Sequence, residues 1–289
     1  MAASACNSLA LSAAIRRFSI SCATFRRYGH PTRRRSQGDS TDMAEFAGKV
    51  VIVTGAGDGI GRASAREFAE KGAKLVLIDV KGVEAIADEL KAQGVEVIAA
   101  TLDVRDAEGW EKLVAEVLTQ FGTIDALVNN AGVAVPGDTA ADVSEDVWDK
   151  IMDVNAKGVW LGMKAVLPTM IAKKSGKICN VASTAAHIGL KNAAAYCASK
   201  GAVLALTRQA GVQYAPLNIQ INSVSPGTTM TGLQRDVTEE QRAAFLPLTP
   251  IGRFAASEEV SSVIVFLCSN GSSFMTGADV SIDGGMVAL

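Results

Sequence analysis

The sequence predicts a doubly wound α/β domain, in which helices cover both faces of one parallel sheet. Two observations lead to this prediction. Short apolar runs typical of buried parallel strands recur along the chain, and segments with helical periodicity separate them. In addition, 289 residues that are 48% hydrophobic suffice to bury a full core in a single domain. Strands that alternate with helices favour a parallel sheet over a sandwich or a helical bundle.

The predicted elements follow one another from residue 49 to residue 282. Apolar runs predict strands at 49–53, 74–78, 95–99, 126–128, 177–181, 219–224 and 279–282. Helical patterns cover a segment after Gly61 that stops at Gly72, and residues 106–120, 145–172 and 195–214. Periodicity is weaker over 228–253, so we expect no regular element there.

A glycine-rich turn follows the first strand. Residues 54–61 read Thr-Gly-Ala-Gly-Asp-Gly-Ile-Gly and lead directly into a helical pattern. Such a turn brings backbone amides and a helix N-terminus close to an anion, as a dinucleotide pyrophosphate site requires. A glycine cluster by itself also fits any tight turn. Asp79 closes the next strand, about 20 residues further on, where a carboxylate can accept hydrogen bonds from a ribose diol or simply cap the strand end.

Tyr196 and Lys200 are four residues apart in a predicted helix, so they share one helical face. A phenol has an ordinary pKa of about 10, and a nearby ammonium group lowers it toward the range of a general base. The same spacing also arises by chance in many helices. The pair therefore indicates catalysis only if further motifs accompany it.

An ordered set of further motifs accompanies the pair. With this set, residues 45–289 of the chain resemble the short-chain dehydrogenase/reductase family. Each motif is modest alone, but the order and spacing of the set are specific. The matching positions are residues 54–61, Asp79, residues 102–104, residues 129–132, Asn155, Ser183, Tyr196, Lys200, Pro226, Gly227 and residues 283–285.

The resemblance implies a single Rossmann-type domain at 43–289 with a seven-stranded sheet, and an oxidoreductase that interconverts a secondary alcohol and a ketone. Ser183 would hold the substrate oxygen, and Tyr196 would transfer the proton. Lys200 would lower the pKa of Tyr196 and bind the nicotinamide ribose, while Asn155 would hold a water that links Lys200 to solvent. Helices around 145–172 and 195–214 resemble those that pair in dimers and tetramers, so we expect a homo-oligomer.

The resemblance also places the cofactor contacts. Asp103 would bind the adenine amine, and Ala131 and Gly132 would let the backbone approach the ribose. Thr231 either holds the nicotinamide carboxamide or caps the segment that follows, whereas Asn129 ties strands together. The full set of expected cofactor residues is Gly55, Asp58, Gly59, Ile60, Gly61, Asp79, Asp103, Val104, Asn130, Ala131, Gly132, Tyr196, Lys200, Pro226, Gly227, Thr229 and Thr231.

Charge favours NAD over NADP. A 2′-phosphate would be repelled by Asp79 and by Asp58, although Asp58 also fits a solvated turn residue. Lys81 is the one nearby residue that could neutralise a phosphate.

Apolar side chains dominate the expected substrate pocket, which favours an apolar or cyclic alcohol or ketone over a phosphorylated one. Val135, Ala185, His187 and Met230 are the principal candidates, and a surface position on a loop is the alternative for His187. The other candidates are Val133, Ala134, Ile188, Leu190 and Leu233. Two further functions stay open: a 3-oxoacyl-thioester (acyl carrier protein) reductase that uses NADPH, and a non-catalytic NAD-binding regulator.

Residues 1–42 differ in composition from the remainder. They hold seven arginines, and their acids are Asp39 and Asp42, so the remaining chain keeps 21 of the 28 basic and 28 of the 30 acidic residues. An acidic body argues against nucleic acid as the main partner. The leader suits a mitochondrial transit peptide; a disordered extension, or a true start at Met43, remains the alternative. The cysteines form no disulfide or zinc pattern, and we expect no metal and no membrane span.

Overall fold

One parallel sheet organises the molecule. The computed structural model describes residues 45–135, 137–231 and 246–289, so the leader 1–42, Leu233 and much of the 228–253 segment lie outside the described residues. Within the described part, seven strands pair in the order β3-β2-β1-β4-β5-β6-β7, all parallel. They are β1 Val50–Thr54, β2 Lys74–Asp79, β3 Val97–Thr101, β4 Ala126–Asn129, β5 Gly176–Val181, β6 Ile219–Pro226 and β7 Asp279–Ile282.

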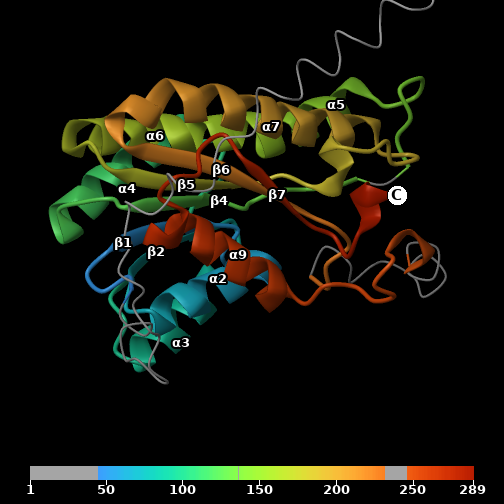
Figure 1. The fold of residues 1–289 in the computed structure, drawn as a ribbon. Coiled ribbons are helices and arrows are strands. Elements are labelled where there is room, and N and C mark those ends of the chain that lie inside the picture. Colours follow the sequence, from blue (N-terminus) through green and yellow to red (C-terminus); the bar gives the residue numbers. More distant parts are fainter. Residues whose placement is uncertain (1–44, 136, 232–245) are drawn as a thin grey trace, which may run out of the picture. The chain divides into compact units, whose positions relative to one another are not determined.

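Helices cover both faces of this sheet (Figure 1). The α-helices of the described residues are α2 Gly59–Glu70, α3 Val83–Ala92, α4 Ala107–Phe121, α5 Glu145–Met152, α6 Gly158–Lys173, α7 Ala194–Tyr214 and α9 Ser257–Cys268. Short turns are η3 Asp153–Lys157, which is π-helical, and the 3₁₀ turns η4 Thr184–Ala186, η5 Ala215–Leu217, η7 Leu246–Leu248, η8 Asn270–Ser272 and η9 Met286–Ala288. The predicted doubly wound sheet is confirmed.

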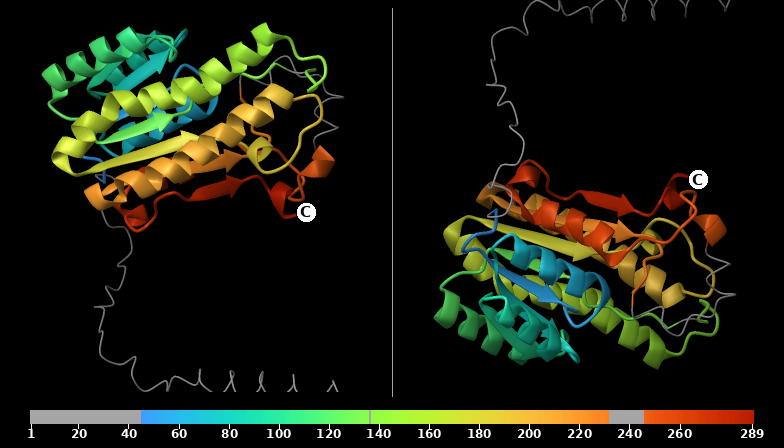
Figure 2. Two further views of the ribbon diagram at one scale, coloured as in Figure 1. Left: turned by 90° about the horizontal axis from the view of Figure 1, so that it is seen from above. Right: turned by 90° about the horizontal axis from the view of Figure 1, so that it is seen from below.

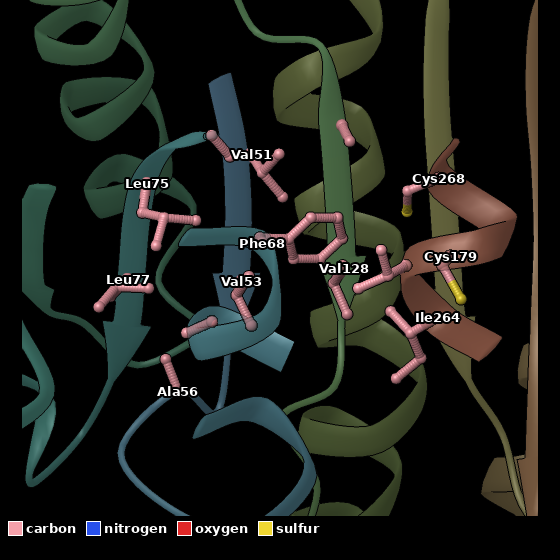
Figure 3. Close-up of a cluster of buried hydrophobic side chains, with 14 of the residues drawn as sticks. Val51, Val53, Ala56, Phe68, Leu75, Leu77, Val128, Cys179, Ile264 and Cys268 are labelled. Atoms are coloured by element: carbon pink, nitrogen blue, oxygen red, sulfur yellow. The ribbon is translucent and has the colours of Figure 1, made fainter. Parts of the chain in front are cut away.

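Two apolar cores lie on opposite faces of the sheet. Figure 2 shows α4, α6 and α7 from one side and α2, α3 and α9 from the other. On the α2 and α9 side, Phe68 packs among Val51, Val53 and Leu75, as Figure 3 shows. On the other side Trp110 of α4 packs in a second cluster with residues of α6 and α7. Because both faces are covered, β1, β2 and β4 are apolar and buried along most of their length, whereas β6 carries buried polar residues such as Asn222 and Ser223.

The structure changes two predicted elements and adds two helices. Strand β3 begins at Val97, two residues later than predicted, because residues 93–96 form the turn after α3. Helices α3 and α9 were not predicted. The single helix expected over 145–172 is divided into α5, η3 and α6, because the π-helical turn accommodates one additional residue.

The order of the strands positions the site. β1 lies between β2 and β4, so the connections leave β1 and β4 toward opposite faces. In open α/β sheets a crevice forms at such a switch point, outside the carboxyl ends of the strands. The glycine turn follows β1, residues 130–135 follow β4, and Ser183 follows β5, so all three meet at this edge.

Candidate active site

The glycine turn connects the end of β1 to helix α2. Gly55 and Gly59 have positive φ angles of 66° and 53°, a region that other residues rarely adopt. A Cβ at Gly61 would lie 2.1 Å from the carbonyl oxygen of Gly55, so the helix can begin here only with glycine. Ile60 is half-buried in the first turn. The N-terminus of α2 is thereby placed at the crevice, where a pyrophosphate would meet its amides.

Asp79 fixes the other side of this turn. Its Oδ2 accepts a hydrogen bond from the Gly57 amide (2.9 Å), and its Oδ1 accepts from Val80 (2.7 Å) and Lys81 (3.3 Å). A Cβ at Gly57 would lie 2.3 Å from the Lys81 carbonyl oxygen. The carboxylate remains half-exposed. Asp79 therefore caps the end of β2 and still has lone pairs for a ribose diol.

Two further acids are held by local contacts. Asp58 caps α2 by accepting from the Gly59 amide at 2.8 Å. Asp103 receives the guanidinium of Arg105, at 2.6 Å from Nη2 to Oδ2, and this pairing lowers the pKa of the Asp103 carboxyl. Val104, the next residue, is buried, and its carbonyl accepts from the Trp110 indole at 3.0 Å. Its side chain packs in the core, so any cofactor contact by Val104 would have to use its backbone.

Two asparagines at the end of β4 have structural contacts. Asn129 donates to the Val159 carbonyl (3.3 Å) and to Asn180 Oδ1 (2.9 Å), so it ties neighbouring elements together. Asn130 Nδ2 donates to the carbonyls of Thr54 (2.9 Å) and Gly55 (3.2 Å) and thereby holds the glycine turn. Thr54 has a structural role that its sequence position did not indicate. Its Oγ1 accepts from the amides of Asn130 (2.9 Å) and Ala131 (3.0 Å).

Asn155 lies in the π-helical turn η3 and is fully buried. Its side-chain amide forms a two-way pair with Val133, accepting from the amide at 2.8 Å and donating to the carbonyl at 2.9 Å. It also donates to Ser199 Oγ at 3.1 Å. A Cβ at Gly132 would lie 3.3 Å from Asn155 Oδ1 and 3.5 Å from Lys200 Nζ, which places these residues side by side.

The Ser183 hydroxyl lies close enough to the Tyr196 phenol to lower the pKa of that phenol. Ser183 follows β5 and is 8% exposed, and its Oγ accepts from the Ala185 amide at 3.2 Å. Burial raises the pKa of the Tyr196 phenol above its ordinary value, and the Ser183 hydroxyl only partly opposes this effect. The effect of Lys200 on the pKa of Tyr196 is not among the causes of this shift, so that expectation stays a prediction.

Lys200 lies one turn after Tyr196 on α7. Its Nζ is 5.8 Å from the centroid of the Tyr196 ring and donates to the Val181 carbonyl at 2.9 Å. The residue is 4% exposed, and burial lowers its pKa to about 8. The structure thus brings Asn155, Ser183, Tyr196 and Lys200 together at one end of the crevice.

The candidate substrate residues have different surroundings. Val135 is half-buried and Met230 is exposed, whereas Ala185 is buried beneath Ser183. His187 is not a free surface residue: its Nε2 lies 2.8 Å from Asp279 Oδ2 and 3.1 Å from Ser225 Oγ. Because both partners share one ring nitrogen, this trio does not have the geometry of a hydrolytic triad.

Residues after β6 return to the glycine turn. The Gly227 amide donates to the Ile282 carbonyl at 2.9 Å, and a Cβ at Gly227 would lie 2.8 Å from Asp283 Cα. Thr229 is buried and donates to the Gly227 carbonyl at 3.1 Å, which fixes the turn after Pro226. A Cβ at Gly59 would be 2.9 Å from Cβ of Thr231, so Thr231 covers the start of α2.

This geometry agrees with comparisons to known proteins. A family profile described as Enoyl-(Acyl carrier protein) reductase matches residues 55–287. The crystal structure of a short-chain type dehydrogenase/reductase from Mycobacterium marinum superposes with a TM-score of 0.81 at 32% identity, over 85% of this chain and 98% of that chain. The chain belongs to the short-chain dehydrogenase/reductase family.

Characterised relatives of this short-chain dehydrogenase/reductase include alcohol dehydrogenases. It is 41% identical to the NAD-dependent glycerol dehydrogenase of Listeria innocua, over 82% of this chain and 93% of the relative. It is 38% identical to the cis-4-hydroxycyclohexanecarboxylate dehydrogenase of Sinomonas cyclohexanicum, over 84% of this chain and 98% of the relative. The protein is an oxidoreductase that acts on CH–OH groups.

The site fits the nicotinamide dinucleotide that the family uses. An amide-lined glycine turn, a half-exposed carboxylate at the end of β2 and a buried lysine beside Gly132 supply donors and acceptors for pyrophosphate and ribose. Among residues 45–135, 137–231 and 246–289, no group of three or more His, Cys, Asp or Glu side chains is placed to hold a metal. No helix in the same ranges is both long and apolar enough to cross a membrane.

Proposed function

We propose that this enzyme interconverts a secondary alcohol and a ketone on a small apolar or cyclic molecule. The observation that supports this most directly is the placement of the Ser183 hydroxyl beside the Tyr196 phenol, with Lys200 one helical turn away. The names of the two relatives, a glycerol dehydrogenase and a hydroxycyclohexanecarboxylate dehydrogenase, agree with an alcohol as substrate. The apolar candidates Val135 and Met230 favour a substrate without a phosphate group.

The bound dinucleotide would supply or accept a hydride, and the protein moves the proton. Ser183 Oγ holds the substrate oxygen beside the Tyr196 hydroxyl. Burial keeps the proton on Tyr196, which is the form that donates to a carbonyl oxygen during reduction. Lys200 stabilises negative charge on the phenolate that remains. Asn155 holds Val133 and Ser199, so it aligns the segment after β4 with helix α7. General acid–base help of this kind contributes about 10²–10⁴-fold.

NAD(H) is the proposed cofactor. Asp79 and Asp58 place two carboxylates near the expected ribose hydroxyls, and both would repel a 2′-phosphate. The expected alternative, a 3-oxoacyl-thioester reductase that uses NADPH, is supported by the name of a relative, the 3-oxoacyl-[acyl-carrier-protein] reductase of Thermotoga maritima, which is 36% identical over 83% of this chain. A non-catalytic regulator would have no need of a buried lysine beneath a tyrosine.

The first experiment measures turnover by the purified full chain with a panel of alcohols and NAD⁺, and of ketones and acyl thioesters with NADH or NADPH. Tyr196→Phe runs alongside. We expect turnover of a cyclic or apolar alcohol by the wild type, and a loss of about 10²–10⁴-fold in the variant with unchanged NADH binding. Turnover only of acyl thioesters with NADPH would favour the 3-oxoacyl-thioester reductase. Full activity of Tyr196→Phe would contradict proton transfer by Tyr196.

We also propose that residues 1–42 direct the protein into mitochondria and that the folded part assembles as a homodimer or homotetramer. Seven arginines with acids only at Asp39 and Asp42 support the targeting role. A fluorescent protein fused to residues 1–42 should colocalise with mitochondria, and a fusion in which the arginines are replaced by glutamine should not. A diffuse signal from the first fusion would contradict the proposal.

A further inference from the structure

A buried carboxylate from a distant loop caps the helix that carries Tyr196 and Lys200. Asp138 lies in the segment after β4, and its Oδ2 accepts a hydrogen bond from the Ala195 amide at 2.8 Å. Ala195 is the second residue of α7, and Tyr196 is the third. The residue before the helix, Ala193, has no side-chain oxygen to act as a cap. Asp138 therefore supplies from 57 residues away what an N-cap residue normally supplies locally.

Backbone contacts reinforce this connection. Asp138 and Ala193 form a parallel bridge, in which the Gly137 amide donates to the Asn192 carbonyl (3.1 Å) and the Ala194 amide donates to the Asp138 carbonyl (3.3 Å). Gly137 and Asn192 both have positive φ angles, 101° and 55°. Asn tolerates this region better than most residues. The local backbone on both sides is thus shaped to bring the two segments together.

The arrangement leaves one oxygen of the carboxylate unpaired. Asp138 is only 6% exposed, and its Oδ1 has no hydrogen-bond partner among the described residues. An unsatisfied buried acceptor costs stability, and more so when the group is charged. The helix dipole offsets part of this cost because the carboxylate lies at the N-terminus of α7. Packing alone would be served better by an apolar side chain, so the placement suggests a role in orientation.

The same segment is tied to the catalytic residues at its other end. Asn155 holds both the amide and the carbonyl of Val133, and Asp138 holds the first turn of α7. The segment that contains the substrate candidate Val135 is therefore connected to the site at two points. Asp138 connects it to the helix turn that carries Tyr196, and Val133 connects it to Asn155. A shift of α7 relative to this segment would move the phenol relative to Ser183, which is fixed to β5.

We propose that Asp138 is a positioning residue for the reaction: as the cap of α7 it sets the place of Tyr196 between Ser183 and the segment after β4. The inference rests on the proposed function for its effect on turnover. Its structural part, a cap that keeps the first turn of α7 closed and the phenol of Tyr196 shielded from water, is measurable without any substrate.

The test compares Asp138→Ala with Asp138→Asn and Asp138→Ser in the full chain. Three quantities are measured: hydrogen exchange of the amides at 194–196, spectrophotometric titration of the Tyr196 phenol against Tyr196→Phe, and kcat for the best substrate of the panel. In Asp138→Ala we expect exchange to accelerate about 5- to 30-fold. The pKa of Tyr196 should fall toward its ordinary value as water reaches it. Misplacement should lower kcat by about 10- to 100-fold, with little change in the KM of the cofactor.

Asp138→Asn keeps an oxygen that can accept from Ala195 and should restore most of all three quantities, and Asp138→Ser should lie between. The matched control is Asp106→Ala, which removes another aspartate cap, the acceptor for the Gly109 amide in α4 (3.0 Å). It should lower the melting temperature and leave the α7 amides, the Tyr196 titration and kcat at saturating cofactor unchanged.

Wild-type exchange and titration in Asp138→Ala would overturn the cap. A normal kcat despite faster exchange would overturn the positioning role. An Asn variant as impaired as Ala would show that charge, not the cap, matters, and would also overturn the inference. If Asp138→Ala fails to fold, the Asn and Ser variants decide by the same three quantities. A wild type that turns over nothing in the panel would count against the proposed function, while exchange and titration would still decide on the cap.

Discussion

The two ends of the crevice use ionisable groups in opposite ways. At the nucleotide end, Asp58 and Asp79 are exposed or half-exposed and bind backbone amides within 22 residues of themselves. At the catalytic end, Lys200 and Asp138 are almost fully buried; Lys200 donates to the Val181 carbonyl, and Asp138 accepts from Ala195, which is 57 residues away. The first end has charges that solvent screens. The second has charges whose energies depend on burial.

This difference separates recognition from chemistry. An exposed carboxylate changes little in energy when the chain folds. It can therefore accept hydrogen bonds from a ribose or repel a phosphate. A buried ammonium or phenol has a shifted pKa, which is typical of groups that exchange protons at working pH. Removing a charge at the catalytic end should therefore alter stability and its pH dependence. Removing one at the nucleotide end should alter ligand preference.

The larger effect is expected for Lys200→Met. Burial lowers the pKa of Lys200 to about 8, so between pH 8 and its ordinary value of 10.5 the folded chain binds fewer protons than the unfolded chain. The stability of the wild type relative to the variant should therefore rise with pH across that window, by about 2–3 kcal/mol. Turnover of the variant should be lost. Denaturant unfolding of both proteins from pH 7 to pH 10 measures the difference.

A stability that rises with pH in this range is specific to a buried lysine. Below pH 8 the wild type carries the full cost of a buried charge, so Met at this position should be equally or more stable at pH 7 despite the lost bond to Val181. Lys81→Met, at an exposed position near the glycine turn, is the matched control for the loss of a lysine. Parallel pH profiles for wild type and Lys200→Met would refute the buried charge.

A smaller effect is expected at the nucleotide end. Asp79→Asn keeps an oxygen that can accept from Gly57 but removes the negative charge, so the preference for NADH over NADPH should fall about 10-fold. Fluorescence titration of both reduced dinucleotides measures this ratio. Asp58→Asn serves as a comparison with a weaker shift, because Asp58 is more exposed. A wild type that binds NADPH more tightly than NADH would contradict the proposed cofactor.

More of the nucleotide end than of the catalytic end was predictable from the sequence. The glycine turn and Asp79 were predictable because strand, turn and acid follow each other closely in the chain, although the contact between Gly57 and Asp79 was not. Tyr196 and Lys200 were predictable from their helical spacing and from the family resemblance. The direction in which the pKa of Tyr196 shifts was not predictable, because it depends on how much of the folded protein covers the phenol.

The missed contacts share one physical cause. Asp138 and Ala195 are 57 residues apart, and His187 and Asp279 are 92 apart, so no periodicity connects them. Only the fold brings such pairs together. Helix α9 was missed for a related reason: its apolar residues face the sheet and α2 at once, which weakens the one-sided pattern that identifies a surface helix.

The π-helical turn Asp153–Lys157 makes the length of this stretch matter. One residue on a helix corresponds to a rotation of about 100°. Because the turn accommodates one additional residue, deleting one residue would close it to a regular α-helix and keep the phase of α6, whereas inserting one would turn α6 by that angle relative to α5. The insertion would carry Gly162 away from Asn129, where a Cβ would lie 2.5 Å from Oδ1 and only glycine fits. An exposed position such as Lys157 should tolerate substitution, but buried Asn155 should not, and the stretch should not tolerate an insertion.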